Sequence, residues 1–343
     1  MAQIIEKEIE THKNIYEDTK ESRFISVRIG VPFGGVNDDT NMLILSYGYE
    51  ANCKAHIFTK LLQTLPDKYN LTVVCGEYFG AAFMDNSNLT VNSDLTYCYT
   101  MGDETAEEFN DMGILQGLDT VYMTLAALDY IGKKAEELKH IILFGSSHGA
   151  YISHMANLFC PDLYTYVLDI SGYISPYYMP HGRRLKLLTS GTECGEEITI
   201  KYLVSQRADL RYIPAVYDLG YLYASSENNC RIIALQGKED WMVDWKEKEN
   251  FIKSLGNKAE ILLFAEEDID GEMIQNADHS LGLDFVKFFD MILPMILRTR
   301  SPRKPLRNGK VVLGKGSFNL MIDYSMRKPV WRPENNVWLE SNR

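Results

Sequence analysis

The sequence lacks the features that mark a secreted, membrane-spanning or cofactor-dependent protein. Its first residues, MAQIIEKEIETHK, are charged where a secretory signal needs an apolar stretch. No window contains the roughly 18 apolar residues that a membrane-spanning helix needs. There is no glycine-rich phosphate loop and no dinucleotide-binding pattern. We therefore expect a cytoplasmic protein that has no membrane span and needs no cofactor.

Cysteines and histidines with the spacing of metal ligands are also absent. The six cysteines are scattered along the chain and form neither a C-x-x-C pair nor a Cys/His cluster. They occupy positions 53, 75, 98, 160, 194 and 230. We interpret them as reduced thiols in the core or near the surface, and we expect no metal site.

Positive charge is scarce overall but concentrated at one end of the chain. The net charge of -12 argues against nonspecific binding to nucleic acid or to an anionic membrane. Residues 298–343 nevertheless hold 11 Lys and Arg against three acids, so this segment carries +8 and the rest of the chain -20. The simpler interpretation is that this basic C-terminal extension lies against its own acidic body; an anionic partner is the alternative.

Apolar segments of strand length alternate with segments of helical spacing along most of the chain. The strand-like segments are residues 23–32, 41–52, 71–80, 140–147, 164–173, 231–237 and 259–267. The helical segments are residues 54–65, 112–131, 149–159 and 283–297. A strand, helix, strand order requires parallel pairing. We therefore predict an α/β fold with a mostly parallel central sheet flanked by helices.

The alternation lapses between Gly172 and Asn229, where the chain is rich in tyrosine. So long an interruption is usually an insertion that covers a site. We predict that residues 173–229 form a lid or cap within a domain spanning residues 1–297, and that residues 298–343 are a separate extension.

A G-x-S-x-G pattern, GSSHG at residues 145–149, places Ser147 at a strand-to-helix turn. Glycines are needed at both ends because the chain turns so sharply that a side chain there would collide with neighbouring backbone. The pattern alone is weak, since it arises by chance in about one in ten chains of this length. Its position between the apolar run IILF and a helical segment is what predicts a nucleophile elbow.

The same geometry predicts where an oxyanion would bind. Free backbone N–H groups at a helix N-terminus favour negative charge, so the N–H of His148 is one predicted donor. The second should come from the loop after an earlier strand, and we expect it to be the N–H of Tyr49. Gly48, judged by itself, is equally well explained as a simple turn that ends the strand.

A serine nucleophile needs a base to take its proton and an acid to orient that base. In this fold the order along the chain is Ser, then Asp or Glu, then His. The seven histidines are at positions 12, 56, 140, 148, 154, 181 and 279. Only His279 lies in a loop between the last predicted strand and the closing helix, so we predict that it is the base.

Asp240 is the predicted acid because it lies just beyond the carboxyl end of a strand, where open α/β sheets assemble their sites. Asp244 lies four residues further on and is more simply interpreted as a surface or capping acid. Glu239 is the weaker alternative. The predicted catalytic residues are therefore Ser147, Asp240 and His279.

Several of these segments together resemble a bacterial family of α/β-hydrolase-like proteins whose genes often lie beside flagellin-glycosylation and motility accessory genes. The matching segments are GSSHGAY at 145–151, GILQGLD at 113–119, YVLDISGY at 166–173, KED at 238–240 and DGEMIQNADHSLG at 270–282. The resemblance spans roughly residues 20–297. It implies an α/β-hydrolase fold, the same three catalytic positions, and a link to surface glycans. It implies no substrate. The lid insertion, placed after the sixth strand of the fold, rests instead on the lapse in the alternation of strands and helices.

The function that these features predict is that of a serine hydrolase, esterase-like or deacylase-like, working through a covalent acyl-enzyme on a small-molecule or glycan ester. The tyrosines of the insertion offer aromatic faces for a sugar, although ordinary lid packing explains them more simply. An acyltransferase with the same three residues is one alternative. A hydrolase-fold accessory protein without turnover in surface glycosylation is another.

Overall fold

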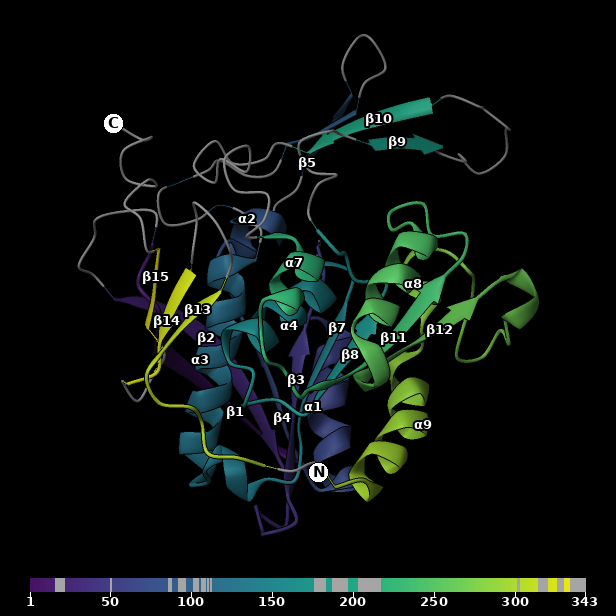
Figure 1. The fold of residues 1–343 in the computed structure, drawn as a ribbon. Helices are drawn as coiled ribbons and strands as arrows, with labels where there is room; N and C mark the ends of the chain where they lie inside the picture. The colour runs from purple at the N-terminus through teal and green to yellow at the C-terminus, as the bar shows by residue number, and fades with distance from the viewer. Residues whose placement is uncertain are drawn as a thin grey trace.

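The computed structural model contains one large sheet of eight strands in the order β1-β2-β4-β3-β7-β8-β11-β12 (Figure 1). The structure describes residues 1–15, 22–49, 51–85, 88–91, 97–100, 105, 109, 111, 113–175, 183–186, 197–202, 217–300, 303–313, 320–325 and 330–333. The pairs β1–β2 and β2–β4 are antiparallel, and every other neighbouring pair of the sheet is parallel. The strands are β1 (Gln3–Thr11), β2 (Arg23–Val31), β3 (Asn41–Ser46), β4 (Leu71–Gly76), β7 (Ile141–Ser146), β8 (Tyr166–Ile170), β11 (Arg231–Gly237) and β12 (Ala259–Phe264).

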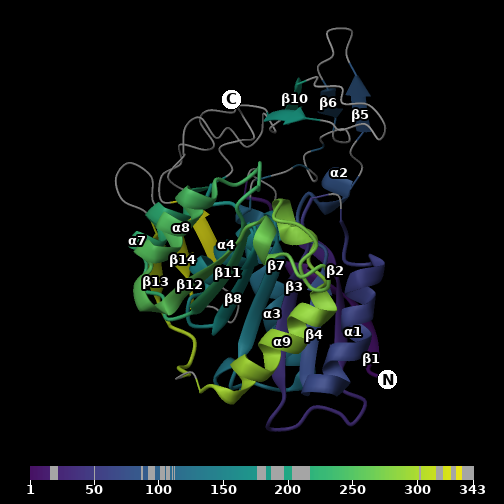
Figure 2. The same cartoon turned by 90° about the vertical axis from the view of Figure 1, so that its right-hand side faces the viewer.

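Helices cover both faces of this sheet (Figures 1 and 2). They are α1 (His56–Tyr69), α3 (Ile114–Ile131), α4 (His148–Phe159), α7 (Leu219–Ala224), α8 (Trp245–Ser254) and α9 (Phe285–Arg298), with a short α2 (Ala81–Asp85) beyond the carboxyl ends of the strands. Helices α1 and α9 contribute to one apolar cluster, and α3, α7 and α8 contribute to the other. The predicted mostly parallel sheet flanked by helices is confirmed.

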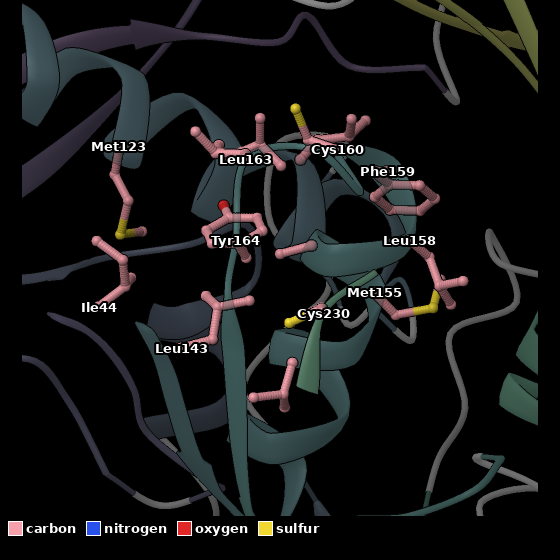
Figure 3. Packing of buried hydrophobic residues seen from close by; sticks show 14 of the residues in the cluster. Ile44, Met123, Leu143, Met155, Leu158, Phe159, Cys160, Leu163, Tyr164 and Cys230 are labelled. Carbon is pink, nitrogen blue, oxygen red and sulfur yellow. The ribbon is translucent and has the colours of Figure 1, made fainter. Parts of the chain in front are cut away.

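The alternation of side chains along β7 explains why the sheet needs helices on both faces. Ile141 and Leu143 belong to the cluster with α3, whereas Ile142 and Phe144 belong to the cluster with α1 and α9. Successive strand residues point to opposite faces, so a strand that is apolar throughout must be buried on both. Figure 3 shows part of the cluster that includes α3, in which Leu143 lies among sulfur-containing and aromatic side chains.

Strand β1 was not predicted, because its sequence is charged. It pairs antiparallel with β2 at the edge of the sheet, and Glu6 accepts a hydrogen bond from Arg28 over 3.1 Å. Charged side chains are common on edge strands, where they discourage pairing with another chain. The charged sequence of β1 therefore fits its position as an edge strand of the sheet.

A second sheet, in the order β5-β6-β10-β9, joins two regions that lie far apart in the sequence. Its strands are β5 (Asn88–Val91), β6 (Tyr97–Thr100), β9 (Arg183–Lys186) and β10 (Glu197–Tyr202), and it is drawn beyond the carboxyl ends of the parallel strands (Figure 2). The predicted lid at 173–229 therefore contributes β9, β10 and α7, but much of it lies outside the described residues. Its extent remains a prediction. No strand was predicted in the polar region that contains β5 and β6.

The basic C-terminal extension contacts the body of the protein. Arg307 forms an ion pair with Asp162 over 2.5 Å, and Arg303 donates to the carbonyl oxygens of Ala135 and Leu163 over 2.8 and 3.0 Å. A third sheet follows, formed by β13 (Lys310–Leu313), β14 (Leu320–Asp323) and β15 (Val330–Pro333). These contacts agree with the simpler interpretation, in which the extension lies against its own chain, while the boundary at residue 298 remains a prediction.

Two further expectations concern cysteine and the membrane. Cys53, Cys75, Cys160 and Cys230 are buried free thiols, whereas the side chains of Cys98 and Cys194 are not among those described. In the part of the chain that the structure describes, no helix combines the length and the apolar character that crossing a bilayer requires.

Removing side-chain volume from the core should destabilise the protein strongly. We expect Leu143→Ala to lower the free energy of unfolding by about 2 to 5 kcal/mol, because Leu143 is fully buried and the change leaves a cavity. The matched control is Leu262→Ala in β12, where the leucine is 46% exposed and the change should cost less than about 1 kcal/mol. Urea denaturation followed by circular dichroism measures both; equal effects would contradict the assigned core.

Candidate active site

Ser147 occupies a sharp turn between β7 and α4. Its φ of 56° and ψ of -125° lie in a region that L-residues rarely adopt. The Ser147 N–H donates to the carbonyl oxygen of Ile170 in the neighbouring strand over 2.8 Å. The turn therefore projects the hydroxyl from the carboxyl edge of the sheet, at the N-terminus of α4.

Close packing explains why both flanking positions are glycine. A Cβ at Gly145 would lie 2.2 Å from the carbonyl carbon and oxygen of Gly149. A Cβ at Gly149 would lie 2.2 Å from the backbone oxygen of Ser46 at the end of β3. Real Cβ atoms do not approach backbone this closely, so any other residue would push helix α4 away from the sheet.

His279 lies beside Ser147, with its Nε2 atom 2.8 Å from Ser147 Oγ. It begins the short 3-10 turn η5 (His279–Gly282), after β12 and before α9. Its N–H is capped by the Asp278 carboxylate over 2.7 Å. The next residue, Ser280, donates its N–H to Ser171 Oγ over 3.0 Å and accepts from Ser146 Oγ over 3.0 Å. The turn is therefore tied to the ends of β7 and β8.

Asp240 lies on the other side of the imidazole. Its two carboxylate oxygens are 3.0 and 2.9 Å from His279 Nδ1. Burial by itself would raise the pKa of Asp240, but hydrogen bonds from His279, Gln236 and the Met242 N–H outweigh it, so the pKa lies below its ordinary value. The carboxylate is therefore held ionised against the imidazole although its side chain is fully buried.

The two alternative acids occupy different places. Asp244 is the N-cap of α8, where its carboxylate accepts from the N–H groups of Lys246 and Glu247 over 2.8 and 3.1 Å. The interpretation of Asp244 as a capping acid is confirmed. Glu239 is exposed. Of the three acids, only Asp240 is shown in contact with His279.

The two predicted oxyanion donors lie at the start of α4, directly after Ser147, and in the loop after β3. His148 is the first residue of α4, and its Nε2 lies 2.8 Å from Gln116 Oε1 in the interior, where burial lowers its pKa to about 3. The ring centroid of Tyr49 lies 4.9 Å from the ring centroid of His148. A Cβ at Gly48 would lie 3.9 Å from Ser147 Oγ, so this loop closely approaches the serine. The donor role of the two N–H groups remains a prediction.

Tyr173 is a residue of the site that was not predicted from the sequence. Its hydroxyl lies 3.0 Å from Ser147 Oγ, and its ring is nearly parallel to the His279 imidazole, with an angle of 15° between the planes. Tyr173 lies three residues beyond the end of β8, whereas the sequence predicts it as the last residue of a strand and the first of the lid. Its place at the carboxyl end of a predicted strand is the signal that could have found it.

A buried ionic network was missed as well. Lys248 of α8 donates to Asp169 of β8 over 2.5 Å and to the Gly172 carbonyl over 2.6 Å, and both charged side chains are fully buried. His154 of α4 contacts the same Asp169 oxygen over 2.8 Å. Burial would raise the pKa of Asp169, but Lys248 and His154 hold it well below its ordinary value. Nothing in the surface-like sequence WKEKEN indicates a buried lysine.

No metal site accompanies these groups in the part of the chain that the structure describes: no cluster of three or more His, Cys, Asp or Glu side chains there is arranged to hold an ion.

Solved structures with this arrangement of strands and helices define the class of the fold. An esterase of Pyrococcus furiosus is 13% identical, with a TM-score of 0.51 over 87% of this chain and 92% of that one. A puromycin-hydrolyzing peptidase of Mycobacterium tuberculosis is 12% identical, with a TM-score of 0.52 over 82% of this chain. An acylaminoacyl peptidase of Pyrococcus horikoshii is also 12% identical, with a TM-score of 0.51 over 84% of this chain. The match covers 38% and 42% of these two peptidases. At such identities the likeness establishes the fold alone, and the predicted α/β-hydrolase fold is confirmed.

The chain belongs to the family described as "Protein of unknown function (DUF2920)", whose model matches residues 82–314, more than half of the sequence. That description names no activity, so the link to flagellin glycosylation remains a prediction. A search of curated proteins gave no match.

Removing Lys248 should leave Asp169 as a poorly compensated buried charge. We expect Lys248→Met to lower the free energy of unfolding by about 3 to 5 kcal/mol. The control in the same helix is Lys253→Met, because Lys253 is 65% exposed and its pair with Glu249 contributes less than about 1 kcal/mol. Both are measured by urea denaturation at neutral pH. A Lys248→Met protein as stable as the control would show that the pair is not needed.

Proposed function

We propose that the chain is a serine hydrolase with esterase-like activity, in which Ser147 is the nucleophile, His279 the general base and acid, and Asp240 the carboxylate that orients the imidazole. One observation supports the proposal most directly: Ser147 Oγ lies 2.8 Å from His279 Nε2, and the opposite ring nitrogen lies 2.9 Å from Asp240. Nucleophile, base and orienting acid are thus each within hydrogen-bond reach of the next.

In the proposed reaction Ser147 Oγ attacks the ester carbonyl while His279 takes its proton and passes it to the departing alcohol. The N–H groups of His148 and Tyr49 would hold the negative charge that develops on the carbonyl oxygen. Water then attacks the acyl-enzyme and releases a carboxylic acid. Asp240 stays ionised throughout and stabilises the imidazolium that forms between the two proton transfers.

The substrate that we propose is a small-molecule or glycan ester, in line with the esterase activity named for the Pyrococcus furiosus protein. An O-acyl group on a sugar is the more specific suggestion and rests on the resemblance to proteins linked with surface glycosylation. Transfer of the acyl group to a sugar hydroxyl would use the same acyl-enzyme, and the acceptor depends on how far the closed site excludes water. Product analysis with an acyl donor and candidate glycans distinguishes hydrolysis from transfer.

The proposal predicts covalent labelling of one serine. A fluorophosphonate probe should modify the wild-type protein at Ser147, located by mass spectrometry of its peptides. Labelling should be lost in Ser147→Ala and in His279→Ala, because each removes a partner of the proton transfer. The control Ser254→Ala, in α8, should label normally. An unlabelled but folded wild-type protein would refute the proposal and favour an accessory role without turnover.

Replacing the acid should slow turnover with little change in stability. We expect Asp240→Asn to lower kcat for p-nitrophenyl acetate by roughly 10⁴-fold, because an amide can hold the imidazole in the wrong tautomer and does not stabilise the imidazolium. The matched control is Asp244→Asn, which alters only a helix cap and should keep at least half of the wild-type rate. If both variants hydrolyse the ester at the wild-type rate, Asp240 has no part in the reaction.

A further inference from the structure

Tyr173 is the second side chain that contacts the proposed nucleophile. Its hydroxyl lies 3.0 Å from Ser147 Oγ, while His279 Nε2 lies 2.8 Å from the same atom. The tyrosine is only 3% exposed, and its ring centroid is 6.0 Å from that of His279. A phenol in this position contacts the atom that gains and loses the acyl group.

The direction of this hydrogen bond follows from the tautomer of His279. The Nδ1 atom lies 3.0 and 2.9 Å from the two oxygens of an ionised Asp240, so it carries the ring proton. In the form that can act as the proposed general base, Nε2 is an acceptor, and the single proton of Ser147 points toward it. The tyrosine hydroxyl must therefore donate to Ser147 Oγ in the resting protein.

The backbone holds this phenol in place through Gly172. The Gly172 N–H donates to Asp169 Oδ1 over 2.8 Å, and its carbonyl accepts from Lys248 Nζ over 2.6 Å. A Cβ at Gly172 would lie 2.5 Å from Asp169 Oδ1 and 2.6 Å from the Cβ of Ala150 in α4. The buried ion pair that joins β8 to α8 thus fixes the peptide that carries Tyr173.

We propose that Tyr173 is a further catalytic residue that favours deacylation, an inference that rests on the proposed function of Ser147. The oxygen of a free serine hydroxyl is a good hydrogen-bond acceptor. The same atom in an acyl-enzyme is an ester oxygen, whose lone pair is delocalised into the carbonyl, and it accepts much more weakly. A donor fixed on Oγ therefore stabilises the free serine relative to the acyl-enzyme.

The hydrogen bond from Tyr173 acts at the step of deacylation in which the bond between the acyl carbon and Ser147 Oγ breaks. During acylation a lone pair of Ser147 Oγ forms the bond to the acyl carbon, and the serine proton passes through His279 to the alcohol that leaves. During deacylation water bonds to the same carbon and gives a proton to His279. The carbon–Oγ bond then breaks, its electron pair stays on Oγ, and Oγ takes that proton back. Tyr173 keeps its own proton and stabilises the negative charge that develops on the departing Oγ.

The test compares Tyr173→Phe with Tyr166→Phe. Tyr166 is also 3% exposed, but it begins β8 at the opposite end from the nucleophile, and its hydroxyl contacts Thr299 Oγ1 over 3.1 Å. Acylation is measured with enzyme in excess, from the release of p-nitrophenolate from p-nitrophenyl acetate. Deacylation is measured from the decay of the acetylated protein by intact mass spectrometry.

We expect Tyr173→Phe to lower the ratio of the deacylation to the acylation rate constant by about three- to tenfold, the range that one hydrogen bond supplies. Tyr166→Phe should leave the ratio unchanged. A folded Tyr173→Phe protein with the wild-type ratio would overturn the proposal, as would a variant in which deacylation becomes relatively faster. Incorporating 4-aminophenylalanine at position 173 retains a weaker donor and should give an intermediate ratio. This replacement also serves as the test if the phenylalanine variant does not fold, and an unchanged ratio then overturns the proposal.

The outcomes separate this inference from the function on which it rests. If wild-type Ser147 is never acetylated, the proposed function fails. If Ser147 is acetylated and released, but the two rate constants do not respond to the group at position 173, only the role of Tyr173 fails.

Discussion

The strained backbone of Ser147 is the constraint on which the geometry of the site depends. A φ of 56° places the hydroxyl outside the sheet and above the first turn of α4, and close packing of Gly145 against Gly149 leaves no room for a different path. Among the described residues, the other non-glycine residues with positive φ are Asn70, Ser171, Ser280 and Leu281. Three of these four lie at the end of β8 or beside His279, so strained backbone gathers where the polar groups converge. Such clustering is typical of functional sites, because the surrounding structure must hold each strained residue in place.

Two buried carboxylates, Asp240 and Asp169, have different partners, which give them different parts in the structure. Asp240 contacts Nδ1 of His279, whose other ring nitrogen lies 2.8 Å from Ser147 Oγ. Asp169 contacts Lys248 and His154, and it joins the strand β8 to the helices α4 and α8. The second network contains no group that reaches Ser147 directly. Its effect reaches the serine through Gly172 and the tyrosine that follows it.

The fold does not determine what the site acts on. Esterases and peptidases share this arrangement of strands and helices with the present chain at 12 to 13% identity. In open α/β sheets, ligands bind outside the carboxyl ends of the strands, in loops that vary between proteins of the same fold. The contact of Tyr173 with Ser147 is a feature of this chain that the fold class alone does not indicate.

The sequence by itself determined the sheet and helices, the turn at Ser147, and the positions of Asp240 and His279 beyond strand ends. These features are local or periodic: apolar spacing sets strands and helices, and glycines on both sides of a serine indicate a sharp bend. Only the tertiary structure decided that β1 joins the sheet, that Lys248 is buried, and that Tyr173 lies on the serine. Each of these depends on a partner far away in the chain. The local sequence, a charged strand, a lysine in a polar helix or one tyrosine among many, does not indicate that partner. The physical reason is that the burial and hydrogen bonding of a residue depend on distant residues of the chain, and only folding brings these residues next to it.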